Sequence, residues 1–143
     1  MAMFQISGVT DTVATNESGK VLRRKFLCQK PTDSDGFVIP PFAPEVIKSN
    51  GRAFEVWIET EAKGKDGQVI NPAEIAKVKL AEAKKSGNQL FMECKLNSVE
   101  QSPVVQGNPA KGNGDKFYQT ITFQVNRSFG RRFVEVEPAG WDL

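Results

Sequence analysis

The amino-acid sequence predicts an all-β protein with one helix, folded as a small five-stranded barrel. Several segments alternate apolar and polar residues with the period of two that is typical of half-buried strands. One segment, residues 71–87, instead carries the start and stop signals of a helix. Clusters of glycine and proline separate these segments, so the predicted order is three strands, the helix and two further strands.

The first two strands are predicted as a hairpin. Residues 3–15 and 20–30 are rich in strand-forming residues, and the turn signal Asn-Glu-Ser-Gly at 16–19 joins them. The third strand is predicted over residues 52–61, where the alternation is clear. One face of this strand carries Phe54, Val56 and Ile58, and the other carries Glu55, Trp57 and Glu59.

Between the second and third strands, residues 31–50 carry four of the eight prolines and are predicted as a long loop. Proline lacks a backbone N–H donor and disfavours sheet pairing. A flexible linker would not carry so many large apolar groups, so we expect the loop to be pinned to the barrel. The residues expected to pin it are Phe37, Val38, Ile39 and Phe42.

The helix has the clearest boundaries in the chain. Asn71 is a favourable N-cap and Pro72 suits the first helical position. Glu74 and Lys84 complement the helix dipole at the two ends, and Gly87 is suited to a left-handed stop. A narrow apolar stripe, suited to closing one end of a barrel, is formed by Ile75, Ala76, Val78, Leu80 and Ala83.

Two strands are predicted after the helix. Residues 89–100 alternate, with Leu90, Met92, Cys94 and Leu96 inward, and residues 117–126 alternate, with Phe117, Ile121, Phe123 and Val125 inward. Residues 101–116 contain three glycines and two prolines and are predicted as a flexible loop. Residues 127–136 suit an extra strand, so residues 1–136 form the predicted domain and residues 137–143 a short C-terminal tail.

The segments AEIAKVKLAEAKKSGNQLFMECKL and DKFYQTITFQVN resemble the helix, fourth strand and fifth strand of bacterial and phage single-stranded DNA-binding proteins. The resemblance covers about residues 72–126 and implies an OB-fold barrel, with strand order β-β-β-α-β-β. It implies a sequence-tolerant single-stranded DNA-binding protein for replication or recombination, encoded by a phage or plasmid and assembled as a homodimer or homotetramer. Family members end in an acidic tail that recruits replication proteins, of which Trp141-Asp142-Leu143 is a reduced version.

Binding of single strands requires flat aromatic surfaces for the bases, and each stacked base contributes roughly 1–3 kcal/mol. The alternation places one aromatic side chain on the outward face of three strands: Trp57, Phe91 and Tyr118. The alternative is that these aromatic rings pack against a loop, the C-terminal segment or a second subunit. Trp57 is flanked by two glutamates that would repel phosphates, so a dimer interface is a second interpretation for this residue.

Binding also requires cations that follow the phosphate backbone. Basic residues gather on the second strand, where Arg23 and Lys25 share one face, and near the C-terminus, where arginines alternate with phenylalanines. Solvated strand faces, or a sheet edge protected by charge, are the alternative explanation. The predicted contact residues for nucleic acid are Arg23, Lys25, Trp57, Phe91, Lys95, Lys111, Lys116, Tyr118, Arg127, Arg131 and Arg132.

Composition argues against an enzyme and predicts no cofactor or metal. The chain has no histidine, which excludes Ser-His and Cys-His catalysis and the usual zinc sites. Its two cysteines, Cys28 and Cys94, are predicted as buried reduced thiols, with a disulfide as the alternative. The net charge of +2 permits a nucleic-acid partner without requiring one.

The expected location is the cytoplasm of a bacterial or phage-infected cell, since no signal peptide or membrane-spanning apolar run is recognised. The competing function is a small β-barrel virion or assembly protein, whose proline-rich loop and C-terminal arm would contact neighbouring subunits.

Overall fold

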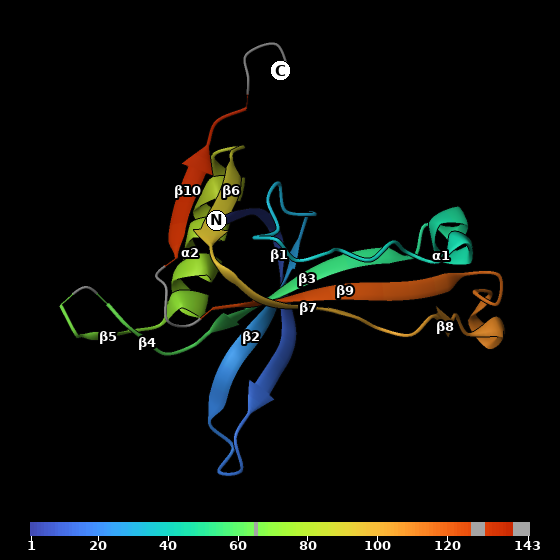
Figure 1. The fold of residues 1–143 in the computed structure, drawn as a ribbon, viewed down its shortest axis with the longest axis horizontal. Coiled ribbons are helices and arrows are strands. Elements are labelled where there is room, and N and C mark those ends of the chain that lie inside the picture. The colour runs from blue at the N-terminus through green and yellow to red at the C-terminus, as the bar shows by residue number, and fades with distance from the viewer. Residues whose placement is uncertain (65, 127–130, 139–143) are drawn as a thin grey trace.

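The computed structural model describes residues 1–64, 66–126 and 131–138. Most of these residues lie in β-strands, which form a curled sheet (Figure 1). The long strands and the main helix lie where the sequence predicts them, except that the single strand predicted over residues 89–100 is divided into two, β6 and β7. Their bounds are β1 (Ala2–Thr15), β2 (Val21–Cys28), β3 (Arg52–Glu59), α2 (Pro72–Lys85), β6 (Gln89–Cys94), β7 (Leu96–Gln101) and β9 (Phe117–Val125).

Short elements complete the structure. The sequence did not predict the helix α1 (Pro44–Ser49), the ribbon of β4 (Ala62–Lys63) and β5 (Val69–Ile70), or β8 (Val105–Gln106) and η1 (Pro109–Lys111). The last two lie within the predicted flexible loop. β10 (Arg132–Val136) pairs with β6 and corresponds to the predicted extra strand, whose residues 127–130 lie outside the described residues.

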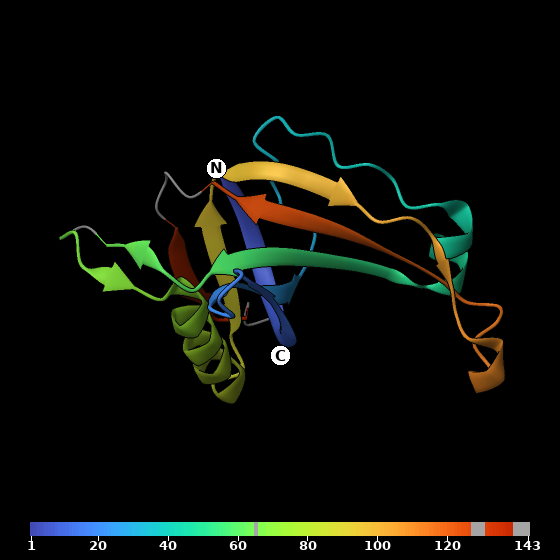
Figure 2. The same ribbon diagram turned by 90° about the horizontal axis from the view of Figure 1, so that it is seen from below.

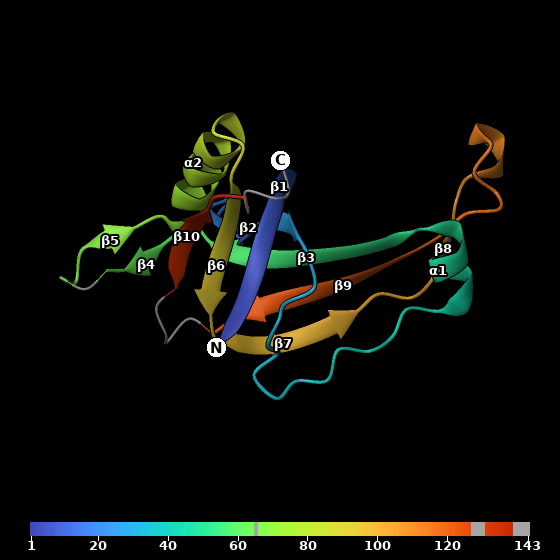
Figure 3. The same ribbon diagram turned by 90° about the horizontal axis from the view of Figure 1, so that it is seen from above.

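The main sheet has the strand order β10-β6-β1-β2-β3-β9-β7, and β8 also pairs with β9. β3 and β9 are parallel, whereas the other neighbours in the sheet are antiparallel. Only Lys95 separates β6 from β7, yet β6 pairs with β1 and β7 pairs with β9. The chain therefore bends at Lys95 and bridges two distant parts of the sheet, which curls it (Figure 3).

The inner face of the sheet holds the core, and the predicted inward sets are confirmed for β6 and the start of β7. Leu90, Met92, Cys94 and Leu96 are all buried. In β9 the prediction holds for Ile121, Phe123 and Val125, whereas Phe117 at the start of the strand is only half-buried. The strand begins beyond the core, so the first inward position has less to pack against.

Helix α2 covers one end of this core. Its buried residues are Pro72, Ala73, Ala76, Leu80 and Ala83. The Asn71 side chain accepts a hydrogen bond from the Glu74 N–H at 3.0 Å, and Gly87 has a φ of 72°, as its predicted role in helix termination requires. These signals come from residues at the two ends of the helix, so the sequence alone predicts where the helix begins and ends.

Residues 31–43 form a strap that runs beside β7 to α1 (Figures 2 and 3). The Gln101 side-chain amide donates to the Pro41 carbonyl at 2.8 Å, and the Phe42 and Phe54 rings meet edge to face at 5.3 Å. The pinning role is therefore confirmed for Phe42, and also for Ile39, which packs on the core. It is wrong for Phe37 and Val38, which are exposed at the end of a turn that the Phe37 N–H closes by donating to the Ser34 carbonyl.

β3 and β9 continue past the core into an arm, defined here as residues 44–53 and 102–120, with α1, β8 and η1 at its far end (Figure 1). Gly51 allows the two strands to approach at this point. A Cβ atom at Gly51 would lie 1.9 Å from the carbonyl oxygen of Phe117. The close approach lets the Gln119 N–H donate to the Gly51 carbonyl at 3.1 Å, which continues the β3–β9 ladder.

Both cysteines are buried and free, which confirms their prediction as reduced thiols. Burial raises the pKa of both thiols, that of Cys94 to about 12. Within the described residues, no helix has the length and apolar character needed to cross a membrane.

Asp35 links the strap to the bend between β6 and β7. Its carboxylate accepts a hydrogen bond from the Leu96 N–H at 2.8 Å and lies 2.9 Å from the Met1 amino group. The hydrogen bond from the Leu96 N–H is the main cause that lowers the pKa of Asp35. The ionised carboxylate therefore stabilises the folded state at neutral pH.

We expect Asp35→Asn to reduce the acid sensitivity of the protein. Because the folded pKa is lowered, the stability that Asp35 contributes is complete above the unfolded pKa of about 3.9 and is lost as pH falls through the folded pKa. Asparagine tolerates the Asp35 φ of 52°, so the turn is retained. Urea midpoints at about pH 7 and about pH 3 test this: the wild type should lose more stability on acidification than the variant, and equal losses would contradict it.

Candidate nucleic-acid interface

The outward faces of three neighbouring strands bring together the residues that we call the Trp57 cluster: Arg23, Lys25, Trp57 and Gln124. The cluster arises from strand register. Lys25 of β2 lies opposite Trp57 of β3, and Gln124 of β9 lies opposite Trp57 on the other side. Side chains directly opposite one another share a face of the sheet. Arg23 is two residues from Lys25 and shares the same face, as the sequence predicts.

Both cations lie over the indole ring. The Arg23 guanidinium carbon is 4.4 Å from the ring centroid of Trp57, and the Lys25 ammonium nitrogen is 4.8 Å from it. These distances are typical of cation–π contacts, which contribute about 0.5–2 kcal/mol depending on solvent exposure. Arg23 also donates from Nη1 to the Gln124 side-chain oxygen at 2.9 Å. The geometry thus gives a partly exposed aromatic ring with two cations held against it.

The two glutamates beside Trp57 each have a cationic partner. Lys25 lies 3.4 Å from the Glu55 carboxylate, and Glu59 forms an ion pair with Arg131. In the described ranges 1–64, 66–126 and 131–138, no carboxylate forms an ion pair with Arg23. The repulsion expected from the glutamates is therefore offset, and Arg23 keeps its positive charge.

The other two outward aromatic residues lie away from Trp57. Phe91 is on β6, opposite Gln5 and Val134, with β1 and β2 between its strand and β3. Three strand spacings correspond to about 14 Å along the curled sheet. Phe91 is half-buried between its neighbours. The predicted set of three aromatic residues is thus not a single surface.

Tyr118 lies on the arm and shares the outward face of β9 with Gln124. Six residues separate the two, which corresponds to about 20 Å along an extended strand. The Tyr118 side chain is 41% exposed and lies opposite Val105 of β8. Lys111 and Lys116 are exposed near η1 at the end of the same arm.

The predicted basic residues near the C-terminus differ in accessibility. The Arg131 side chain is only 7% exposed in its ion pair with Glu59, whereas Arg132 is 68% exposed and lies 3.6 Å from the Glu93 carboxylate. Lys95 is exposed at the bend between β6 and β7. Arg127 lies outside the described residues.

Two residues of this surface were missed by sequence reasoning. Gln124 orients Arg23, and Leu27 is 41% exposed beside Glu55 on the same outward face. Gln124 did fall on the predicted outward face of its strand, but only the β3–β9 register reveals that it reaches Arg23. Parallel pairing of strands that are distant in sequence leaves no local signal.

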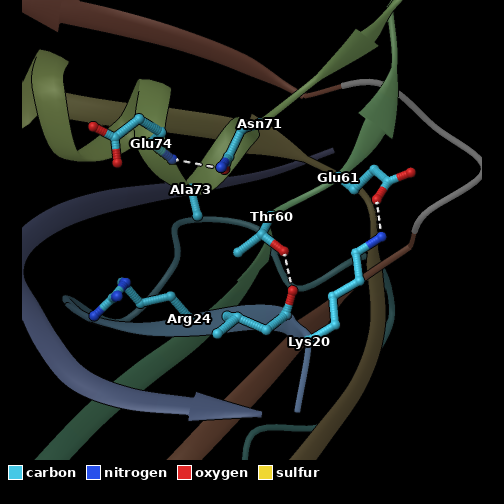
Figure 4. Close-up of a pocket in the computed structure, with 8 residues that line it drawn as sticks. Lys20, Arg24, Thr60, Glu61, Asn71, Ala73 and Glu74 are labelled. Carbon is cyan, nitrogen blue, oxygen red and sulfur yellow. Dashed lines mark hydrogen bonds and ion pairs between the residues drawn. The ribbon is translucent and has the colours of Figure 1, made fainter. Parts of the chain in front are cut away.

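A separate pocket of about 370 Å³ lies between the start of α2 and the ends of β2 and β3 (Figure 4). Several of its polar side chains are already engaged: Thr60 donates to the Val21 carbonyl at 2.7 Å, Lys20 pairs with Glu61 at 2.6 Å, and Arg24 donates to the Thr10 carbonyl at 2.9 Å. Its lining mixes charges of both signs, so it favours no particular ligand.

Comparison of the chain with protein-family models, curated proteins and solved structures found no match. Function therefore has to be inferred from the fold and from the Trp57 cluster.

Proposed function

We propose that the protein is a sequence-tolerant single-stranded DNA-binding protein with an OB-fold barrel, acting in replication or recombination. The observation that carries the proposal is the Trp57 cluster, in which Arg23 and Lys25 lie within 5 Å of the centre of a partly exposed indole ring. An aromatic surface beside cations is what bases and phosphates of a single strand require.

The strand connections support the OB assignment. In sequence order the barrel strands are β1, β2 and β3, then α2, then the bent pair β6–β7, and then β9. β1 pairs with both β2 and β6, and β3 pairs in parallel with β9. This is the order of five strands with a helix between the third and fourth that such barrels have, with the bent pair as the fourth strand.

The proposed mechanism is equilibrium binding without a cofactor. One base stacks on Trp57, while Arg23, which has no carboxylate partner among the described residues, contacts a phosphate and displaces its counterion. A strand that leaves the cluster along β9 reaches Tyr118 after about 20 Å, close to the arm lysines. Bases are held by their flat faces rather than by their edges, so binding tolerates any sequence.

Titration of the protein with a fluorescent oligo-dT of about 30 nucleotides, at low and at moderate salt, tests the proposal. We expect tight binding that weakens as salt rises, with poor competition by duplex DNA. The expected slope of log K against log salt is about −0.7 for each phosphate contact. Absence of binding at low salt would contradict the proposal.

Arg23→Gln is expected to weaken binding evenly across sequences and to reduce the salt slope by about 0.7, because one phosphate contact is lost. Arg24→Gln is the matched control: Arg24 has the same charge on the next residue, but its guanidinium donates to the Thr10 carbonyl. The salt dependence of oligo-dT binding measures both variants. An equal change in the two would mean that only net charge matters and that Arg23 makes no specific contact.

A virion or assembly protein is the second candidate, and exposed apolar residues on the arm favour it. Ile47 is 49% exposed and Val105 is 56% exposed, and Val105 lies opposite Tyr118, which is also exposed. Such residues suit contacts between subunits. Sedimentation of the protein without nucleic acid distinguishes the two functions: extended self-assembly supports the assembly protein, whereas a homodimer or homotetramer is compatible with DNA binding.

A further inference from the structure

Glu59 lies directly across the strand pair from Arg23. The β2–β3 register places the two residues opposite each other. The Cβ atoms of such a pair are about 4.5–5.5 Å apart, so a glutamate can reach the guanidinium of an opposite arginine. A Glu59–Arg23 ion pair would neutralise the cation that lies over Trp57.

Glu59 instead pairs with Arg131, the residue that precedes β10. Their side chains are 9% and 7% exposed, so the pair is buried. Arg23 meanwhile keeps a neutral partner, the side-chain amide of Gln124. The Glu59 carboxylate thus has both Arg23 and Arg131 within reach and pairs with Arg131.

We propose that Arg131 is a positioning residue for the Trp57 cluster: it holds Glu59 away from Arg23 and thereby keeps Arg23 available to phosphate. The inference rests on the proposed function of the cluster. It assigns Arg131 an indirect role, in contrast to the direct contact with nucleic acid that the sequence predicts.

A buried charge without a partner is unfavourable, and this explains why Glu59 would pair with Arg23 if Arg131 were removed. Without Arg131, the Glu59 carboxylate would be buried without a cation, which is strongly unfavourable. Arg23 is the cation directly opposite, and it can move because its present contacts are a neutral hydrogen bond and a cation–π contact. Among the described residues, Oε2 of Glu59 and Nε of Arg131 have no hydrogen-bond partner, so the existing ion pair leaves bonding capacity unused on both side chains.

The arrangement couples β10 to nucleic-acid binding. β10 pairs with β6 from Arg132 opposite Glu93 to Val136 opposite Gln89, and this pairing places Arg131 beside the sheet. Detachment of β10 would withdraw Arg131 and release Glu59. Since coupling between two equilibria is reciprocal, binding of a single strand to Arg23 should also favour the docked state of β10.

A melting experiment without nucleic acid tests the exchange itself. In an Arg131→Met background, Arg23→Gln should lower Tm by at least about 3 °C more than it does in the wild type, because Arg23 would then pair with Glu59. Arg24→Gln should cause the same shift in both backgrounds. Equal shifts for Arg23→Gln in the two backgrounds would overturn the proposal. If Arg131→Met does not fold, Arg131→Gln, which also removes the charge but keeps a polar side chain, replaces it.

A binding experiment tests the consequence. Arg131→Met should weaken binding to oligo-dT by about tenfold, and the double variant Glu59→Gln/Arg131→Met should restore the wild-type affinity and salt slope. Arg132→Gln is the matched control, because it removes the same charge from the neighbouring residue, whose partner Glu93 lies on β6. It should weaken binding only slightly, and adding Glu59→Gln should not change that result. A double variant that binds as weakly as Arg131→Met would show that Arg131 contacts the strand directly and would overturn the proposal.

The two experiments separate the two levels of inference. If the wild type does not bind single strands, the proposed function fails, while the melting experiment still decides whether Glu59 exchanges between Arg131 and Arg23. If the wild type binds and the melting shifts are equal in both backgrounds, the positioning role fails and the proposed function stands.

Discussion

Phe123→Ala is expected to lower the free energy of unfolding by about 3–5 kcal/mol, which is typical of the removal of a buried aromatic side chain. Phe123 is fully buried in β9. Its ring meets Phe4 of β1 edge to face at 5.0 Å and stacks on Phe54 of β3 at 6.2 Å. Phe54 in turn contacts Phe42 of the strap. Removal of one ring therefore disturbs the contacts among β1, β3 and β9 as well as the attachment of the strap.

Thermal and urea unfolding measure the effect. For a chain of this size, a loss of this magnitude corresponds to a fall in Tm of roughly 10–20 °C. Phe123→Leu keeps most of the buried volume and should cost much less, and Gln124→Ala changes the next residue on the outward face and should leave stability nearly unchanged. A loss below about 1 kcal/mol for Phe123→Ala would contradict the packing described for the core.

The elements predicted correctly from the sequence are those with local signals. Alternation over residues 89–100 identified the buried set Leu90, Met92, Cys94 and Leu96, and cap chemistry at Asn71 fixed the start of α2. Each signal depends on residues only a few positions apart. The helix α1 was missed because six residues in a proline-rich segment give no periodic pattern, and tertiary contacts such as the hydrogen bond from the Phe117 N–H to the Ser49 hydroxyl at 2.9 Å hold it in place.

The candidate site was only partly predictable, because it depends on register between distant strands. The sequence places Arg23 and Lys25 on one face and Trp57 on an outward face, but not the two cations over the ring. It also interprets Glu55 and Glu59 as repulsive. Their neutralisation by Lys25 and Arg131 depends on pairs formed across the fold, the second over more than seventy residues of chain.

The same long-range contacts distinguish the arginines near the C-terminus. Alternation with phenylalanine makes Arg131 and Arg132 equivalent in the sequence, whereas the structure buries Arg131 against Glu59 and leaves Arg132 exposed. Burial of an ion pair depends on which elements meet in space, and β3 and β10 are not neighbours in the sheet order. A composition argument about basic clusters therefore overestimates the number of cations available to a ligand.

Trp57→Ala should have the largest effect on the proposed DNA binding. Loss of one stacked base costs roughly 1–3 kcal/mol, which corresponds to a loss of affinity of about 5- to 150-fold. Trp57 also supports Arg23 and Lys25 through cation–π contacts, so its removal frees both side chains to adopt other rotamers. Direct titration with oligo-dT measures the loss, and unfolding curves verify that the half-buried position tolerates alanine.

Two further variants serve as controls for Trp57→Ala. Trp57→Phe keeps a flat ring and should restore most of the affinity, whereas Phe91→Ala removes a ring about 14 Å away along the sheet and should have a smaller effect. Trp57→Ala should also leave the salt slope almost unchanged, since the phosphate contact comes from Arg23, whereas Arg23→Gln should flatten the slope. A Trp57→Ala variant that binds as tightly as the wild type would contradict stacking at this position, and the dimer interface suggested by the sequence would then be the better explanation for a partly exposed tryptophan.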